Sequence, residues 1–540
     1  MKNHSRISEG PRLKHLFEKS HWGPWLVMAV VFVVLLPFGI TRYVVEDEGY
    51  YLYAAELILQ GKTPYVDFFY PQMPIFPYFY AAWMWLFGVG WFSARVFTIL
   101  QCAGVAALLF HWVRRETNSL FWSIWAAVLF TFSSLTIYSF LTARTFAITV
   151  VTALASLILI TGNTEKHVWL KAGGAGFLAA VCFGCRLMMA PIIPLILLIS
   201  LLRKSNHRWQ RLGVCLVGLG LGLLPLAFFY FKDSALFAFN NLGFHSYRHT
   251  EAGLISDFRQ KAEIALGMLG HTFAKGGIGA QFLLLTVIVL GGLGRWRTWT
   301  VSELAVIIYG AISVVVALLP TPTFHAYFAV PLPFWIMAAT LHLAHSARNF
   351  DEQSLTAAAG RKWVWLTFSL YILLATPDFV YCSYLYKHFQ GEGGQNGTTF
   401  SYKTDCDPQK INEVSGLIRR KAGPEDSILS FWSGYLLGTG RQPYPNTESH
   451  VTFNHAPLLS RELSADMLHR YRLVNESDIN LIIQQQRVAF IVTSFAENES
   501  SNTSWVRRYW EPIISAAGYI AAYQVGQTVI YSLPNRVASK

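Results

Sequence analysis

Long apolar segments recur through the first 380 or so positions, and short polar loops separate them. A helix needs about 20 consecutive apolar residues to cross a bilayer. The pattern therefore predicts a polytopic α-helical membrane protein with about 11 transmembrane helices. The expected segments are 24–43, 91–112, 120–139, 144–161, one ending near Arg186, one beginning near 188, one ending near Phe231, one returning to Arg295, two that frame Pro320–His325, and 363–382.

The distribution of charge gives these segments an orientation. Lysine and arginine gather in the short loops on one side of the predicted membrane, as in Arg114–Arg115 and Arg203–Lys204, which the positive-inside rule places in the cytoplasm. These loops account for the formal net charge of +12, so we infer no nucleic-acid partner. The expected organisation is a cytoplasmic tail at 1–23, a transmembrane domain at 24–386 with outer loops at 44–90 and 232–275, and an outer domain at 387–540.

The composition changes after Tyr386, where a polar linker is followed by alternating helical and strand patterns. This alternation predicts a small soluble α/β domain on the outer face. The expected helices are Pro408–Lys421, Ser464–Gln486 and Ser504–Ala516, and the expected strands are Ser427–Trp432, Val488–Ser494 and a closing hairpin of Tyr519–Val525 and Thr528–Leu533.

The six cysteines show no spacing typical of a metal site. Cys182 and Cys185 form a CxxC in an apolar stretch, where packing is the better interpretation than redox chemistry. Cys382 and Cys406 both fall on the predicted outer side, where a disulfide between them is one alternative.

The first outer loop concentrates the acidic residues of this apolar chain. Five carboxylates, Glu46, Asp47, Glu48, Glu56 and Asp67, stand against one lysine, Lys62, between positions 46 and 77. A single Asp before a helix is usually an N-cap, worth about 1 kcal/mol. Three consecutive acids repel one another, so binding a cation or accepting a substrate proton explains them better. For Glu56 we favour a solvated face residue, and Asp67 could open a turn.

Two short helices are expected in the same loop. Gly49–Gln60 has helical length, and Gly61 follows it as a C-terminal cap. Ile75–Phe87 follows a cluster of prolines and closes at Gly88. Both are too short to cross a bilayer, so we expect interfacial helices at the membrane surface, with Asp47 at the N-terminus of the first.

At these residues the sequence resembles the GT-C membrane glycosyltransferases, in the branch that includes the aminoarabinose transferases and the protein O-mannosyltransferases. The resemblance lies in the order of the features and covers 25–115 well. These features are a short tail, a first span, Asp47-Glu48-Gly49-Tyr50, Gly61-Lys62, a proline-rich turn and Ala94-Arg95 entering the second span, with looser likeness at Gly184–Pro194 and Pro320–Phe334. It implies a GT-C-like fold in a bacterial inner membrane, with the active site on the outer face.

The resemblance also implies a reaction. The donor would be a polyprenyl-phosphate-linked sugar, transferred with inversion to a hydroxyl of an envelope lipid, glycan or protein. By this analogy Asp47 is the general base, which needs a carboxylate within hydrogen-bond reach of the acceptor hydroxyl. Glu48 would position the acceptor or, together with Asp47, a divalent cation such as Mg²⁺ or Mn²⁺. Tyr50 and Asp67 are the nearby substrate-binding candidates.

One position departs from the aminoarabinose transferases, which carry a lysine in the turn that here reads Tyr70-Pro71-Gln72-Met73-Pro74. Gln72 is neutral, which puts a phosphate contact and the particular sugar in doubt. Other cations must then hold the donor phosphate, and arginine suits this best because its planar fork makes bidentate contacts. The candidates are Arg144, Arg186, His245, Arg248, His249, Arg259 and Lys275, with His325 and Tyr327 placed by the resemblance; the two arginines Arg144 and Arg186 could instead cap span ends, and 232–275 could be a solvated loop.

Two other functions fit the composition. A transporter or flippase of lipid-linked sugars would place charges or broken helices at mid-membrane and often show inverted repeats, whereas these acids lie in a surface loop. A non-catalytic scaffold could use the outer domain to bind a partner. The order of motifs in the first loop favours the glycosyltransferase.

Overall fold

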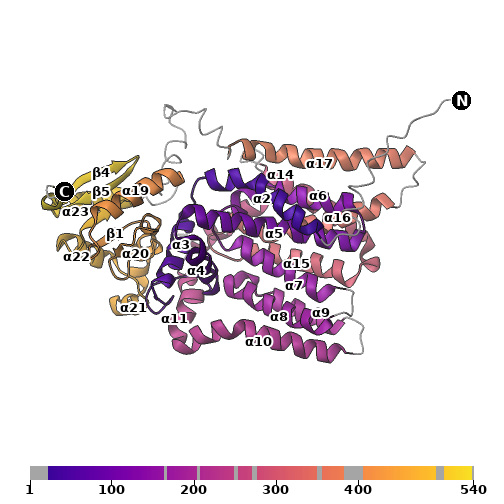
Figure 1. Cartoon of the computed structure of the whole chain (residues 1–540), viewed down its shortest axis with the longest axis horizontal. Coiled ribbons are helices and arrows are strands. Elements are labelled where there is room, and N and C mark those ends of the chain that lie inside the picture. The colour runs from indigo at the N-terminus through magenta and orange to yellow at the C-terminus, as the bar shows by residue number, and fades with distance from the viewer. Residues whose placement is uncertain are drawn as a thin grey trace.

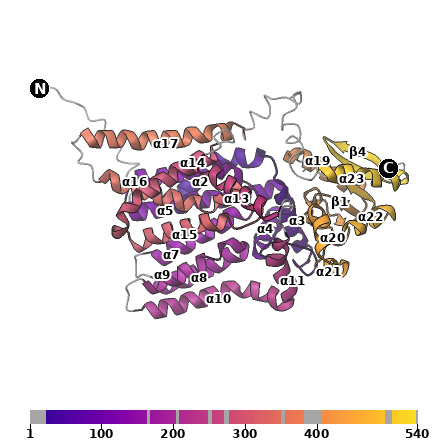
Figure 2. The same ribbon diagram turned by 180° about the vertical axis from the view of Figure 1, so that it is seen from behind.

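The computed structural model describes residues 22–162, 167–202, 207–247, 253–270, 277–348, 355–381, 406–493 and 504–537. A helical bundle forms one part, and the C-terminal domain lies against one end of it (Figures 1 and 2). The bundle helices lie side by side along the long axis of the molecule. Their bounds are α2 Gly23–Thr41, α5 Trp91–Thr117, α6 Leu120–Thr131, α7 Phe146–Thr161, α8 Val168–Cys185, α9 Ile192–Leu202, α10 Arg208–Lys232, α14 Ile278–Gly292, α15 Val301–Ala317, α16 Leu332–Arg348 and α17 Leu355–Tyr381.

A helix occupies each of the expected spans, but the one expected at 120–139 ends at Thr131, and a separate short helix, η1 (Thr136–Phe140), follows it. Among the described residues, six helices are long and apolar enough to cross a membrane, and α6, α7, α9 and α15 are shorter apolar helices of the same bundle. Aromatic and aliphatic side chains stay exposed on the bundle surface, as on a face in contact with lipid. The chain is therefore a polytopic helical membrane protein, as its apolar pattern predicts.

Glycine allows close packing between α8 and α10. A Cβ atom on Gly176 would lie 2.0 Å from the carbonyl oxygen of Cys215, and one on Gly218 would lie 2.0 Å from that of Gly173. The backbones of the two helices can approach this closely only because these positions carry no side chain.

The first loop forms the two expected helices, α3 (Glu46–Leu59) and α4 (Ile75–Phe87). The first begins at Glu46, three residues earlier than predicted, because the acidic residues make its first turn. Gly61 and Gly88 follow with φ of 86° and 89°, a conformation that glycine adopts without strain. The second predicted outer loop also contains helices that the sequence pattern did not reveal: α11 (Ser234–Ala238), η3 (Phe239–Gly243), α12 (Phe244–Ser246) and α13 (Gly253–Met268).

The C-terminal domain is a mixed sheet covered by helices, in the order β2-β1-β3-β5-β4. β1 pairs in parallel with β2 and β3, and β5 pairs antiparallel with β3 and β4, so that Ile491 stands between Leu429 and Tyr531. Trp510 packs with these residues in the domain core. The elements are α19 Pro408–Lys421, β1 Ser427–Ser430, η8 Ser433–Leu436, β2 Gln442–Pro443, α20 Val451–Glu462, α21 Ala465–Arg470, α22 Glu476–Gln484, β3 Phe490–Val492, α23 Ser504–Ala516, β4 Ile520–Val525, β5 Thr528–Ser532 and α24 Pro534–Val537.

Trp432 joins the C-terminal domain to α3. Its indole Nε1 donates to the carbonyl oxygen of Glu46 at 3.0 Å, and its ring stacks on Trp91 with centroids 5.7 Å apart. Gly49 lies against the same ring, and a Cβ there would come within 2.6 Å of it. The glycine of the Asp47-Glu48-Gly49 sequence is thus required for domain packing.

Candidate active site

The three consecutive acids of α3 have three different environments. The N-cap position is Val45, in extended conformation, and the Glu48 carboxylate accepts from its backbone N–H at 2.9 Å. Glu48 therefore caps the helix, and Asp47 is not the N-cap. Asp47 is exposed on the first turn, while Glu48 is fully buried.

Glu48 is held by groups from two other segments. Arg95 of α5 donates from Nη2 to Oε1 at 2.7 Å, and its Nε lies 2.7 Å from Oε2. The backbone N–H of Ala143 donates to Oε2 at 2.8 Å. Because Glu48 adjoins Asp47 and Ala143 adjoins Arg144, this carboxylate fixes the distance between the segments that carry Asp47 and Arg144.

Arg95 extends the same network to the end of α2. Its Nη1 donates to the carbonyl oxygens of Gly39 at 2.7 Å and Leu141 at 3.3 Å. Gly39 lies in the last turn of α2, where backbone carbonyls lack partners within the helix. A single buried guanidinium thus ties together α2, α3, α5 and the segment before α7.

Arg144 and Arg186 both pack on the ring of one phenylalanine, Phe146. The guanidinium carbons of Arg144 and Arg186 are 5.1 and 4.4 Å from the centroid of the Phe146 ring. Arg144 donates to Thr142 Oγ1 at 3.0 Å, and Arg186 donates to Thr145 Oγ1 at 2.6 Å. The structure therefore brings together two guanidinium groups that are 42 positions apart in the chain.

Tyr327 belongs to the same cluster. It lies in η6 (His325–Ala329), and its ring centroid is 5.3 Å from the Arg186 guanidinium carbon. His325 is partly buried in the same turn. The resemblance placed both residues near the site, and a role for either in substrate binding stays a prediction.

Asp47 lies within electrostatic reach of these cations through Tyr51. Burial and, to a smaller extent, the charge of Asp47 raise the pKa of the Tyr51 hydroxyl to about 12, and Arg186 and Arg144 oppose the rise. The Tyr51 hydroxyl therefore interacts electrostatically with one carboxylate and two guanidinium groups. Among the described residues, no ion pair joins Asp47 to either arginine. The Asp47 carboxylate is exposed to solvent on the first turn of α3.

The remaining first-loop candidates have mainly structural contacts. Tyr50 is buried with its ring centroid 4.2 Å from that of Tyr51. Asp67 Oδ2 accepts from the Thr63 N–H at 2.6 Å, which is the turn-forming role considered for it. The carbonyl oxygen of Gln72 accepts from the Tyr65 hydroxyl at 2.5 Å.

The basic candidates in 232–275 are not all in the described part of the chain. Arg248, His249 and Lys275 lie outside the described residues, as does Cys382. Arg259 lies on α13 with its side chain 80% exposed and paired with Glu263 at 2.9 Å. His245 is in α12, where its ring centroid is 5.6 Å from that of Phe244. Neither has a described contact with Arg144 or Arg186.

The prediction that Glu56 is a solvated surface residue is wrong. Its carboxylate is buried against the C-terminal domain and accepts from the Gly438 N–H at 2.8 Å. Burial raises the pKa of Glu56 to about 7, and the Gly438 hydrogen bond and Arg419 oppose the rise. The prediction failed because the surface that covers Glu56 comes from a segment almost 400 positions away, which helical periodicity cannot reveal.

The donor groups at this site do not fit a divalent cation. Both oxygens of Glu48 already accept hydrogen bonds, and Glu46 lies 3.6 Å from His450, which leaves Asp47 as the most open of the three carboxylates on this turn. No group of three His, Cys, Asp or Glu side chains suited to a metal occurs in the described part of the chain. We therefore derive no step through a metal ion.

No protein-family model and no curated protein sequence matches the chain. Among solved structures, apo ArnT from Cupriavidus metallidurans matches 96% of this chain and 100% of its own, with a TM-score of 0.63 and 12% identity. The same protein bound to undecaprenyl phosphate matches 96% and 99%, with a TM-score of 0.63 and 14% identity. The chain has the fold of ArnT. This likeness confirms the predicted GT-C-like fold, since it covers the bundle and the C-terminal domain together.

The sequence analysis did not predict two groups of residues that the structure places at the site. The sequence pattern identifies Arg95 only as one feature in the order of motifs. A charged residue inside an apolar span needs a partner of opposite charge, and this requirement is the signal that could have revealed its pairing. Glu448 and His450 come from the C-terminal domain: Glu448 lies 3.9 Å from Lys62, and His450 Nε2 lies 3.6 Å from Glu46. Nothing local in the sequence marks this pair.

Proposed function

We propose that the protein is an inverting glycosyltransferase that moves a sugar from a polyprenyl-phosphate donor to an acceptor hydroxyl. One observation carries the proposal: the exposed carboxylate of Asp47 and the guanidinium groups of Arg144 and Arg186 all act electrostatically on the Tyr51 hydroxyl, and both guanidinium groups pack on the Phe146 ring. This transfer requires a base and phosphate-binding cations in one site. ArnT, an aminoarabinose transferase with the same fold, has been solved with undecaprenyl phosphate bound, which supports this choice of donor.

Each group has a role in the proposed reaction. Asp47 accepts the proton of the acceptor hydroxyl as its oxygen attacks the anomeric carbon. The bond from that carbon to the phosphate oxygen breaks, and the polyprenyl phosphate leaves with the bonding electron pair. Arg144 and Arg186 bind the phosphate and stabilise the charge that develops on it. Attack from the side opposite the phosphate inverts the anomeric configuration.

Glu48 takes a positioning role in this scheme in place of the metal-binding role that the resemblance implies. Its two oxygens connect α3 to Arg95 and to the Ala143 N–H. It thereby sets the position of Asp47 relative to Arg144 without touching substrate. The acceptor in this proposal is a hydroxyl of a lipid, a glycan or a protein at the outer face of a bacterial inner membrane.

Replacement of the base tests the proposal. Asp47→Asn is expected to lower sugar transfer from polyprenyl-phosphate sugars in membranes by about 100-fold or more. Glu46→Gln is the matched control, because it removes a charge from the same helical turn and is expected to retain most activity. Transfer by Asp47→Asn at the wild-type rate would show that this carboxylate is not the base. A wild-type protein that moves the intact lipid-linked sugar across vesicles without transferring it would indicate a transporter instead.

A further inference from the structure

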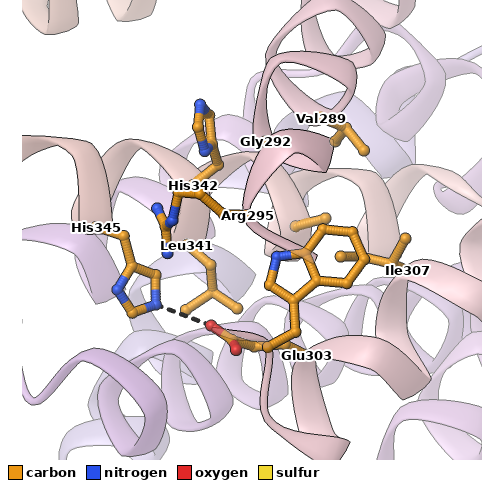
Figure 3. A pocket seen from close by; sticks show the side chains of 10 residues that line it. Val289, Gly292, Arg295, Glu303, Ile307, Leu341, His342 and His345 are labelled. Carbon is orange, nitrogen blue, oxygen red and sulfur yellow. Dashed lines mark hydrogen bonds and ion pairs between the residues drawn. The ribbon is translucent and has the colours of Figure 1, made fainter. Parts of the chain in front are cut away.

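A second polar cluster lies at the opposite end of the bundle from Glu48. It lines a pocket between the C-terminal end of α14, the N-terminal end of α15 and the C-terminal end of α16 (Figure 3). Arg115, near the end of α5, donates to Ser302 at the start of α15 at 3.0 Å, which places the pocket at that end. The helical rise from Arg95 to Arg115 is roughly 30 Å, so this pocket is separate from the candidate active site.

Arg295 is the permanently charged cation of the pocket. His342, His345 and one acid, Glu303, line the pocket with it. Glu303 Oε1 lies 2.8 Å from His345 Nε2, the pair joined by a dashed line in Figure 3, and Oε2 accepts from the Thr300 N–H at 2.7 Å. Both oxygens of the acid are therefore already engaged, and neither neutralises Arg295.

Arg295 has an unsatisfied donor. Its Nη1 is buried and has no hydrogen-bond partner among the described residues. A buried guanidinium nitrogen without an acceptor is costly, and an anion in the pocket would remove that cost. This is an independent indication that the pocket receives a negatively charged ligand.

The backbone makes room for this arrangement. A Cβ on Gly292 would lie 3.0 Å from the His342 ring, so any larger residue there would push the ring away from the last turn of α14 by a few tenths of an ångström. The pocket is open on the side of His345, whose side chain is 30% exposed, and closed at Glu303, which is 7% exposed. Trp296, on the same turn as Arg295, is 63% exposed, as aromatic side chains often are at the level of lipid headgroups.

We propose that this pocket binds a phosphate group, with Arg295 as the principal donor and His342 and His345 beside it. Two sources have this chemistry: the headgroup of an anionic phospholipid in the adjacent leaflet, and free phosphate. A neutral headgroup offers no unshared negative charge to Arg295 and is not expected to bind.

The test uses the full chain and compares two neighbouring arginines. Arg295→Gln removes the proposed donor, whereas Arg297→Gln removes an arginine from the same turn that does not line the pocket. Each protein is reconstituted with phosphatidylglycerol or phosphatidylcholine, and retained lipid is measured by native mass spectrometry. Inorganic phosphate is titrated separately against protein in a neutral detergent by calorimetry.

We expect Arg295→Gln to lower the affinity for phosphatidylglycerol or for inorganic phosphate by about tenfold relative to Arg297→Gln. Loss of the lipid alone identifies the headgroup as the source, and loss of inorganic phosphate alone identifies the free ion. Equal binding by the two variants in both arms overturns the proposal. If Arg295→Gln does not fold, His342→Gln replaces it, and the same comparison with Arg297→Gln decides.

Discussion

Glu48 and Arg95 form a buried ion pair in which Nε of Arg95 lies 2.7 Å from Oε2 of Glu48, with both side chains at most 2% exposed. The pair connects α3, the helix that carries Asp47, to α5. It explains why an acid and a base occur in an otherwise apolar environment, because each neutralises the other. The neighbouring Asp47 has no such ion pair with the described residues. This contrast distinguishes Glu48, which holds the fold together, from Asp47, which is available for chemistry.

Removal of one member of this pair is expected to destabilise the fold strongly. Glu48→Gln leaves the Arg95 guanidinium buried without a counter-charge, which costs about 3–5 kcal/mol of unfolding free energy. Denaturation of the purified protein measures this loss. Glu413→Gln, on the exposed surface of α19, is the control and should change stability by less than about 0.5 kcal/mol. Equal stability of the two variants would contradict a structural role for Glu48.

The contact between Gly49 and Trp432 predicts the effect of adding one methyl group. Gly49→Ala would place a Cβ within 2.6 Å of the indole ring, so the C-terminal domain must shift, at a cost of about 1–3 kcal/mol. Gly220→Ala in α10 is the control, because no described atom lies within 4 Å of its added Cβ and alanine favours the helix. Thermal unfolding should show a loss of stability for Gly49→Ala and none for Gly220→Ala.

The pair of arginines on Phe146 predicts a defect in donor binding. Arg186→Lys keeps the charge but loses the planar fork, so we expect the KM for the polyprenyl-phosphate sugar to rise about tenfold. Arg144→Lys should act in the same direction. Arg259→Gln, whose side chain is 80% exposed, is expected to leave KM within about twofold. An unchanged KM in both lysine variants would place the donor phosphate elsewhere.

Two buried carboxyl groups predict how stability depends on pH at the domain contact. Burial raises the pKa of Glu56 to about 7 and that of Glu448 to about 7, from a model-compound value of 4.5. The folded protein therefore holds protons that the unfolded chain releases. The stability from these groups is fully present below pH 4.5 and is lost as the pH rises to about 7.

His450 has the opposite effect on the pH dependence of stability, at lower pH. Burial lowers its pKa from 6.5 to about 3, so the folded state disfavours its charged form and stability falls as the pH drops from 6.5 towards 3.

Denaturation of the wild-type protein and of the variants Glu56→Gln and Glu448→Gln across pH 4.5–8 tests the role of the two carboxyl groups. Each variant should show a smaller loss of stability than the wild type as the pH rises. If the stability of both variants falls with rising pH as steeply as that of the wild type, other groups cause the pH dependence.

The sequence by itself determined the local structure of this protein. Apolar length placed a helix at each expected span, and the glycines after α3 and α4 ended those helices where predicted, because both signals act over a few neighbouring residues. The alternating pattern of the C-terminal domain likewise gave helices such as α19 and α23 their bounds. The acidic stretch also directed attention to Asp47.

Only the tertiary structure decided what each charged residue does. Glu48 and Asp47 are adjacent and chemically alike, and they differ because Arg95 and the Ala143 N–H reach one and not the other. Glu56 is buried because Gly438 covers it. Arg144 and Arg186 come together because both guanidinium groups pack on Phe146. Such contacts join residues tens to hundreds of positions apart, and the pattern along a single segment carries no record of them.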